Sequence, residues 1–246
     1  MIDAVGVVIP ARDEESRIGT CLDSVRLALS RVPDRVQPRL CVVLDSCTDR
    51  TPWVVAGLLR GWPGAHVVTV RHHPPGAGVG LARDLGVRAL LRRLRPLAPE
   101  RVWLLNTDAD TTVPASWVRE QLRYAAGGAH GVAGLADLRG EPRLSGNGGD
   151  RYREIVSSGV RGATHDHVYA ANLGVRGDAY LRCGGFPAWG HGEEHQLWRA
   201  MTEAGCRLRQ PSDLRVSTSA RITGRAEGGL AALLRSIDAD EARSAG

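Results

Sequence analysis

The runs Val5-Gly6-Val7-Val8-Ile9 and Leu40-Cys41-Val42-Val43-Leu44 are short, apolar and rich in β-branched residues, and an amphipathic stretch from Glu15 to Ser30 separates them. A strand, a helix and a second strand in this order form a βαβ unit. Strands that are apolar throughout, rather than alternating, are typical of sheets buried on both faces. The pattern therefore predicts an α/β fold with a mostly parallel central sheet and helices on both of its faces.

The same alternation continues along the chain. It predicts strands at 66–70 and 102–105, and helices that begin at Thr48 or Thr51 and at Gly80. In the more glycine-rich second half it predicts helices at 150–158 and 193–204 and strands near 168–175 and over 206–216. The length favours a single domain over residues 1–237, followed by a flexible polar tail over residues 238–246.

Composition excludes several classes of protein. All 32 residues counted as lysine or arginine are arginines. A Walker-type phosphate loop, a Schiff-base enzyme and a Ser-Lys hydrolase each need a lysine, so none of these fits. The net charge of +5 does not identify an anionic partner by itself, and we expect no nucleic acid among the partners.

No targeting or crosslinking signal stands out. The longest apolar runs have the length of strands and fall far below the roughly 20 residues that span a bilayer. Because no leader-like segment opens the sequence, we expect a cytoplasmic protein without a transmembrane segment, and a peripheral membrane contact is left open. The five cysteines contain no CxxC pair, which predicts neither a disulfide framework nor a zinc knuckle.

Acidic residues follow three of the predicted strands. They are Asp13 and Glu14, Asp45 and Asp49, and Asp108 and Asp110. In an open α/β sheet, ligands bind beyond the carboxyl ends of the strands. The pair Asp108 and Asp110, one residue apart in a tight turn, can converge on a hard cation such as Mg²⁺ or Mn²⁺. Acidic residues also cap helices after such turns, and for this pair alone that alternative stays open.

Five segments, in this order, resemble motifs of glycosyltransferase family 2. Val8-Ile9-Pro10-Ala11-Arg12-Asp13-Glu14 is similar to the opening strand and its Pro-x-x-Asn-Glu turn, with Asp13 in place of asparagine. Val43-Leu44-Asp45-Ser46-Cys47-Thr48-Asp49 resembles the Asp-Asp-x-Ser-x-Asp turn. Gly78-Val79-Gly80-Leu81-Ala82-Arg83-Asp84-Leu85-Gly86 is similar to the helix start that ends in Ala-Arg-Asn-x-Gly.

Two further segments complete the resemblance. Ala171-Asn172-Leu173-Gly174-Val175-Arg176, with Gly184-Gly185-Phe186, is similar to the acceptor-side segment. Glu193-Glu194-x-x-Leu197 resembles the Glu-Asp-x-x-Leu motif, whose second acid is the catalytic base. The resemblance runs from Val5 to Leu234 and implies the GT-A fold.

The resemblance also implies a set of site residues for a nucleoside-diphosphate-sugar donor, a divalent cation (Mn²⁺ or Mg²⁺) and an unidentified acceptor. Asp45 would bind the base of the donor, Asp110 with Asp108 would bind the cation, and Glu194 would be the catalytic base. Further donor contacts would come from Pro10, Ala11, Arg12, Glu14, Arg83 and Asp108. Acceptor or sugar contacts would come from Asn172, Trp189 and Glu193, and diphosphate contacts from Arg221 and Arg225.

The chemistry of an inverting transfer agrees with these assignments. A carboxylate must take the proton from the attacking hydroxyl on the side opposite the leaving diphosphate. Glu194 is one methylene longer than the aspartate of the family motif, which shifts the carboxylate. Two acids at a helix start also complement the helix dipole, and this ordinary explanation stays open for Glu193 and Glu194 taken alone.

Parts of the sequence also fit two other classes of protein. His191, Glu194 and His195 satisfy the HxxEH pattern of a zinc peptidase, for which Glu227 would be a distal ligand, but Gly190 and Gly192 argue against one continuous helix. A non-catalytic relative that binds a nucleotide is a further alternative.

Three smaller motifs are ambiguous. The glycines from Gly76 to Gly86 miss the dinucleotide fingerprint, because its third position falls on Leu81 or Arg83. His165-Asp166-His167 is interpreted as an exposed loop, or a segment near the acceptor, rather than a metal site. Among Trp189, Trp198 and Tyr180, Trp189 is the best candidate to stack on a sugar.

Overall fold

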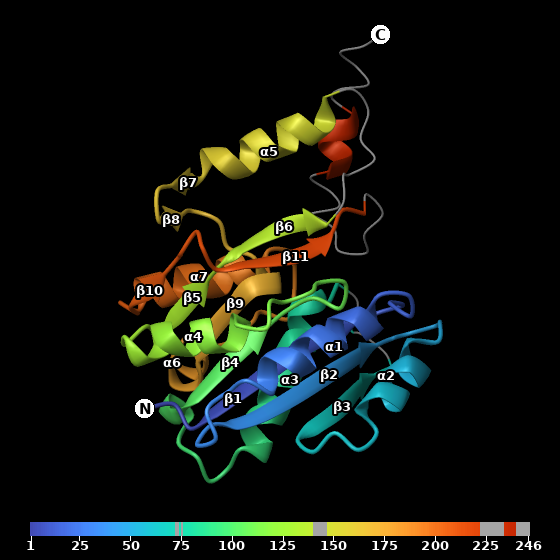
Figure 1. Cartoon of the computed structure of the whole chain (residues 1–246), viewed down its shortest axis with the longest axis vertical. Helices are drawn as coiled ribbons and strands as arrows, with labels where there is room; N and C mark the ends of the chain where they lie inside the picture. The colour runs from blue at the N-terminus through green and yellow to red at the C-terminus, as the bar shows by residue number, and fades with distance from the viewer. Residues whose placement is uncertain (72–73, 75, 140–146, 222–233, 240–246) are drawn as a thin grey trace.

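The computed structural model of the chain describes residues 1–71, 74, 76–139, 147–221 and 234–239. Figure 1 shows a central sheet with helices on both sides and a two-stranded ribbon between that sheet and helix α5. The strands of the central sheet are β1 (Ala4–Ala11), β2 (Gln37–Asp45), β3 (Ala65–Val70), β4 (Val102–Asn106), β5 (Gly131–Ala133), β9 (Leu173–Arg176) and β10 (Leu208–Arg209).

These seven strands lie in the order β10-β5-β9-β4-β1-β2-β3. Strand β9 is antiparallel to both of its neighbours, β4 and β5, and the other adjacent pairs are parallel. All eight residues of β1 are buried. The predicted mostly parallel α/β sheet is therefore confirmed, with one antiparallel strand inside it.

Within the described residues, six helices cover the two faces of this sheet. They are α1 (Ile18–Leu29), α2 (Thr51–Leu59), α3 (Val79–Arg93), α4 (Trp117–Ala126), α6 (Gly177–Arg182) and α7 (Glu193–Glu203). Helices α1, α2 and α4 share one hydrophobic cluster with Val5, Val7 and Ile9 of β1, whereas α3, α6 and α7 share another with Ala4 and Val8. The alternation along β1 thus assigns one layer of helices to each face.

Glycine allows α3 to lie directly on the sheet. A Cβ atom at Gly86 would lie 2.6 Å from Cγ1 of Val8 and 2.9 Å from Cγ2 of Val43. At this position only a residue without a side chain lets the helix approach β1 and β2 so closely. Arg83 lies on the same helix, so the close packing at Gly86 also sets how close Arg83 lies to the sheet.

A second layer lies over one end of the sheet. Strands β6 (Leu135–Arg139) and β11 (Arg215–Ser219) pair in parallel, and α5 (Gly148–Ser158) lies above them (Figure 1). Tyr152 of α5 packs with Leu234 and Ile237 from the helical residues 234–239. The remaining short elements are the hairpin of β7 (Val160–Arg161) and β8 (Thr164–His165) and the 3₁₀ helices η1 (Pro99–Arg101) and η2 (Ala170–Asn172).

Two of the predicted strands differ from the observed ones. Residues 206–216 do not form one strand, because β10 ends at Arg209 and Pro211, which has no backbone N–H to donate, separates it from β11. The strand predicted near 168–175 begins only at Leu173, after η2. The boundary at residue 238 stays a prediction: residues 238 and 239 are helical, and residues 240–246 lie outside the described part.

Candidate functional site

A cavity of about 580 Å³ opens at the carboxyl ends of β1, β2 and β4. Residues at the start of α7 and at the end of β11 also line it. Predicted site residues from distant parts of the chain line this cavity. They are Pro10, Ala11, Arg12, Glu14, Asp45, Arg83, Asp108, Asp110, Glu193, Glu194 and Arg221.

The turn after β4 presents two carboxylates of different exposure. The side chain of Asp108 is 38% exposed, whereas that of Asp110 is 10% exposed. Burial, followed by the nearby charge of Asp108, raises the pKa of Asp110 to about 6. Thr218 of β11 donates a 3.4 Å hydrogen bond to Oδ1 of Asp110, so the second layer of the fold reaches this turn.

Arg83 joins this turn to the start of α7. Its Nη2 lies 2.5 Å from Oδ1 of Asp108, and its Nε lies 3.1 Å from Oε1 of Glu193. Burial opposes the charge on Arg83, but Asp108 and Glu193 outweigh it and raise the pKa of the guanidinium. A side chain that is 3% exposed thus stays ionised between two carboxylates.

Arg221, just beyond β11, forms a second bridge. Its Nη2 lies 2.5 Å from Oε1 of Glu14 and 3.1 Å from Oδ2 of Asp110. The side chain of Arg221 is 23% exposed and that of Glu14 is 5% exposed. Arg225, the other predicted diphosphate contact, lies outside the described residues.

Glu194 is the second residue of α7 and faces the cavity. Burial, followed by the charge of Glu193, raises the pKa of Glu194 to about 7. The start of α7 lies very close to Gly80 of α3. A Cβ atom at Gly80 would lie 2.1 Å from the carbonyl oxygen of Pro187 and 3.0 Å from Cβ of Glu193, so a side chain there would push the two segments apart. The absence of a side chain at Gly80 therefore brings both acids to the cavity.

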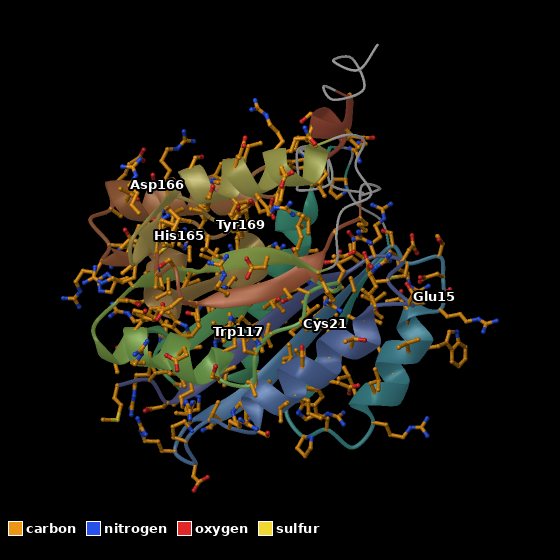
Figure 2. All side chains as sticks on the ribbon, turned by 45° about the horizontal axis from the view of Figure 1, so that its top comes forward. Glu15, Cys21, Trp117, His165, Asp166 and Tyr169 are labelled. Atoms are coloured by element: carbon orange, nitrogen blue, oxygen red, sulfur yellow. The ribbon has the colours of Figure 1, made fainter. Side chains whose placement is uncertain are left out.

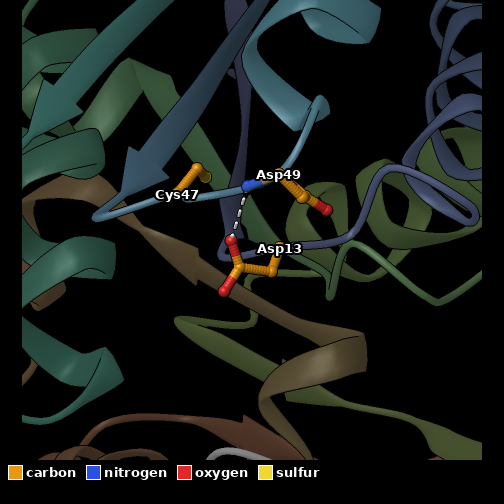
Figure 3. A group of neighbouring side chains, drawn as sticks. All are labelled: Asp13, Cys47 and Asp49. Atoms are coloured by element: carbon orange, nitrogen blue, oxygen red, sulfur yellow. Dashed lines mark hydrogen bonds between the residues drawn. The ribbon is translucent and has the colours of Figure 1, made fainter.

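Asp13 joins the turn after β1 to the turn after β2. Its Oδ1 accepts hydrogen bonds from the backbone N–H groups of Thr48 (2.6 Å) and Asp49 (3.2 Å) and from the Thr48 hydroxyl (3.1 Å). Asp13, Cys47 and Asp49 lie close enough to be considered as metal ligands, and Figure 3 shows them together with the Asp13 bond to the Asp49 N–H. These bonds use the Asp13 carboxylate to join the turns after β1 and β2. The arrangement of Asp13, Cys47 and Asp49 is therefore explained by a structural role, and we refer to these bonds as the Asp13 clasp. Arg12, just before Asp13, and Asp45, at the end of β2, both line the cavity.

Two predicted residues lie outside the lining of the cavity. Asn172 is fully buried; its Oδ1 accepts from Nε1 of Trp117, and its Nδ2 donates to the carbonyl oxygens of Leu135 and Leu214. These three bonds join η2, α4 and the second layer, which differs from the predicted contact with an acceptor. Trp189 is 55% exposed and bridges to Ala77 beside the cavity wall.

The zinc-peptidase pattern is not realised. Gly192 has a left-handed backbone (φ 68°) and precedes α7, so His191 lies in the loop and His195 lies on the helix. The two histidines therefore do not share a helical face. Glu227, the distal ligand considered for this alternative, lies outside the described residues.

Sequence reasoning missed an aromatic wall made by Tyr152 and Tyr169, which both line the cavity. Tyr169 stacks on His167 at 5.5 Å between ring centroids, and His167 on His165 at 6.0 Å; His165 and Tyr169 lie below α5 in Figure 2. His165 is buried and Asp166 is exposed, so the predicted loop cluster is half packed into the protein. The available signal was that Tyr169 lies two residues before the Ala171–Arg176 motif; nothing in the sequence near Tyr152 indicated its place in the wall.

Solved structures share this fold. The chain is similar to the mannosyltransferase PcManGT from Pyrobaculum calidifontis in complex with GDP-Man and Mn²⁺, with a TM-score of 0.64 and 19% identity over 90% of this chain and 57% of that one. It is also similar to S. aureus TarS 1-349 in complex with UDP-GlcNAc, with a TM-score of 0.64 and 15% identity over 93% of this chain and 60% of that one. The architecture is thus that of the GT-A glycosyltransferases, although the chain spans less than two thirds of either protein.

The sequence itself identifies the family. The glycosyl transferase family 2 model matches residues 6–177, and the chain belongs to this family. No curated protein matches the chain. Among the residues that the structure describes, no helix combines the length and apolarity needed to cross a membrane.

Proposed function

We propose that the protein is an inverting glycosyltransferase that moves a sugar from a nucleoside-diphosphate sugar to an acceptor hydroxyl with the help of a divalent cation. The observation that carries this proposal is that Asp45, Asp110 and Glu194, from three separate parts of the chain, line one cavity of about 580 Å³. A cavity of this size matches the range of small-molecule sites, which is roughly 300–1,000 Å³.

The donor nucleotide would lie at the ends of β1 and β2. Asp45 is 8% exposed at the end of β2, where its carboxylate can accept hydrogen bonds from a base. Pro10, Ala11 and Arg12 line the same wall and would contact the nucleoside. The nearby clasp between Asp13 and the β2 turn would hold this wall in place before the donor arrives.

The carboxylates of Asp108 and Asp110 fit a hard cation. They offer oxygen ligands alone, which suit Mn²⁺ or Mg²⁺. Burial raises the pKa of Asp110 to about 6 despite the opposing charge of Arg221, so a further positive charge would stabilise the ionised carboxylate. When bound, the cation would neutralise charge that develops on the leaving diphosphate. Arg221 would contact that diphosphate, and Arg83 would hold Asp108 in position.

Glu194 would act as the catalytic base. Its pKa of about 7, raised mainly by burial, lets it take a proton from the acceptor hydroxyl near neutral pH. Glu193 is held by Arg83 and would orient the acceptor or sugar beside it. Trp189 would stack on a sugar ring at the edge of the cavity, and the wall of Tyr152 and Tyr169 offers further apolar area.

The test is a donor panel. Purified protein is incubated with UDP-, GDP- and dTDP-sugars with and without manganese, and binding (thermal shift) and donor turnover are measured. We expect one donor class to stabilise the protein and to be turned over only with the cation. Asp110→Asn abolishes cation-dependent turnover, Glu194→Gln keeps donor binding without turnover, and the exposed Asp23→Asn on α1 serves as the matched control.

Two outcomes would contradict the proposal. Full activity of Asp110→Asn would refute the role of the cation. Donor binding without turnover by the unaltered protein, across a panel of acceptors, would instead favour a non-catalytic relative that only binds nucleotides.

A further inference from the structure

Arg221 is paired with the same carboxylate that is proposed to hold the cation. One nitrogen, Nη2, lies 2.5 Å from Oε1 of Glu14 and 3.1 Å from Oδ2 of Asp110. Both acids line the cavity with side chains at most 10% exposed. Buried carboxylates need a counter-charge, and a guanidinium supplies it here.

A divalent cation and this guanidinium cannot share Asp110 without cost. Both are positive, and they would meet within the distance of a single carboxylate, where like charges repel strongly in a partly buried site. The arginine must therefore leave Asp110, or the cation must bind weakly. An anionic diphosphate in the same cavity offers a second partner, because guanidinium groups bind phosphates by charge-assisted hydrogen bonds.

We propose that Arg221 is an exchangeable counterion that pairs with Glu14 and Asp110 until a divalent cation and a nucleoside diphosphate bind together, and then transfers to the diphosphate. This inference rests on the proposed function of the site. It makes binding of the cation and the diphosphate cooperative, since each ligand removes the obstacle to the other. The cation alone is held weakly.

The surroundings of Arg221 allow such an exchange. It stands two residues beyond β11 rather than within a helix, and its side chain is 23% exposed. By contrast, Arg83 is 3% exposed and contacts its two acids with two different nitrogens from within α3. Of the two bridges, the one made by Arg221 is the one that a ligand can open.

Arg139 provides a matched control. Its Nη2 lies 3.4 Å from the backbone carbonyl oxygen of Asp110, and the residue is exposed. Arg139→Gln therefore removes the same charge from the same neighbourhood without removing a partner of the carboxylate. Arg221→Lys keeps the positive charge and reports on the guanidinium itself.

The experiment measures binding of Mn²⁺ alone by calorimetry and by electron paramagnetic resonance. We expect Arg221→Gln to bind Mn²⁺ about five- to tenfold more tightly than the unaltered protein, the lower end of coupling between interacting sites. Arg139→Gln stays within about twofold, because an exposed charge is screened by solvent and salt. Arg221→Lys stays close to the unaltered protein, and melting curves confirm that each variant is folded.

The measurement is then repeated with saturating UDP or GDP, whichever binds. The diphosphate tightens Mn²⁺ binding more in the unaltered protein than in Arg221→Gln, since only the former has an arginine to release. Any one of three results overturns the exchange. Arg221→Gln binds Mn²⁺ no more tightly than the unaltered protein, Arg139→Gln gains as much affinity as Arg221→Gln, or no variant binds Mn²⁺.

The two proposals fail separately. Tighter Mn²⁺ binding by Arg221→Gln without turnover of any nucleotide sugar keeps the exchange and removes glycosyl transfer. Cation-dependent turnover with unchanged Mn²⁺ affinity in Arg221→Gln does the reverse.

Discussion

Two arginines bridge pairs of carboxylates in the same cavity, and their surroundings differ. Arg83 reaches Asp108 and Glu193 from the middle of the fold, since α3 lies directly on β1 and β2 through Gly86. Its side chain is 3% exposed. Without Arg83, the buried carboxylate of Glu193 would lose its counter-charge, and water could not replace it.

The second bridge lies where the described chain leaves the sheet. Arg221 follows β11, is 23% exposed and reaches Glu14 and Asp110 through one nitrogen. Two bridges of the same chemical type can therefore have opposite roles. The buried one fixes the geometry of the acids, and the more exposed one can be replaced by a ligand.

The largest expected effect comes from Arg83→Gln. We expect the free energy of unfolding to fall by about 3 kcal/mol, because breaking a buried ion pair strands its partners in a low-dielectric site. Urea denaturation at pH 7.5 measures this loss. Arg88→Gln is the control, since Arg88 lies on the same helix with a 51% exposed side chain and an i,i+4 partner. A loss no greater than that of the control would show that Arg83 is not a structural bridge.

The next effect concerns Glu194, whose carboxylate is disfavoured by its burial. Its pKa is raised from 4.5 to about 7 in the folded protein, so the folded state loses stability as pH rises from the lower value through the higher one. Glu194→Gln does not titrate and escapes that loss. We expect this variant to be more stable than the unaltered protein by about 2 kcal/mol at pH 8 and by little at pH 4.

Thermal or urea melts at the two pH values test this expectation. Exposed Glu203→Gln at the end of α7 controls for removal of one acid from the helix. Equal stability of Glu194→Gln and the unaltered protein at pH 8 would mean that burial of the ionised Glu194 carboxylate costs the folded state no stability.

The pKa of Glu194 also predicts the acid limb of activity. A base must be deprotonated to accept a proton, so kcat/KM falls about tenfold per pH unit below pH 7 and is level above it. The pH profile of kcat/KM with saturating cation measures the limb. A limb centred near 4.5 would show that burial and the charge of Glu193 do not raise the pKa of the group that accepts the proton.

The same contrast explains what the sequence could predict. The first half of the central sheet was found because β1 and β2 contain long buried runs that only a covered parallel sheet accommodates. In the second half, β5 has three residues and β10 has two, too short for a period to be recognised. The pairing of β6 with β11 joins Leu135 to Arg215, a partnership that no local pattern encodes.

The site was predictable to a similar degree. Acids that follow strands were expected at one edge of the sheet, and Asp45 and Asp110 indeed lie in the same cavity. An ion pair was a plausible role for Arg83, but its partners were not predicted, since Arg83 meets Glu193 across 110 residues and such pairing depends on packing rather than spacing. Asn172 was placed near the acceptor by motif alone, and its three hydrogen bonds inside the protein depend on neighbours from distant elements. The roles assigned to these residues stay predictions.

The smallest expected effect is that of Arg221→Gln on stability. We expect a loss of about 1 kcal/mol at pH 8, because the guanidinium is 23% exposed and water can take part of its place beside the two acids. Asp110 has a pKa of about 6, raised first by burial, and Arg221 is the charge that opposes the rise, so the variant raises it further. A carboxyl whose pKa is raised on folding costs no stability at low pH, where it is protonated in both states. It costs stability as pH rises towards and through the raised pKa. The deficit of Arg221→Gln should therefore shrink between pH 8 and pH 5.5 in urea melts, whereas a deficit as large as that of Arg83→Gln at both values would make the two bridges equivalent.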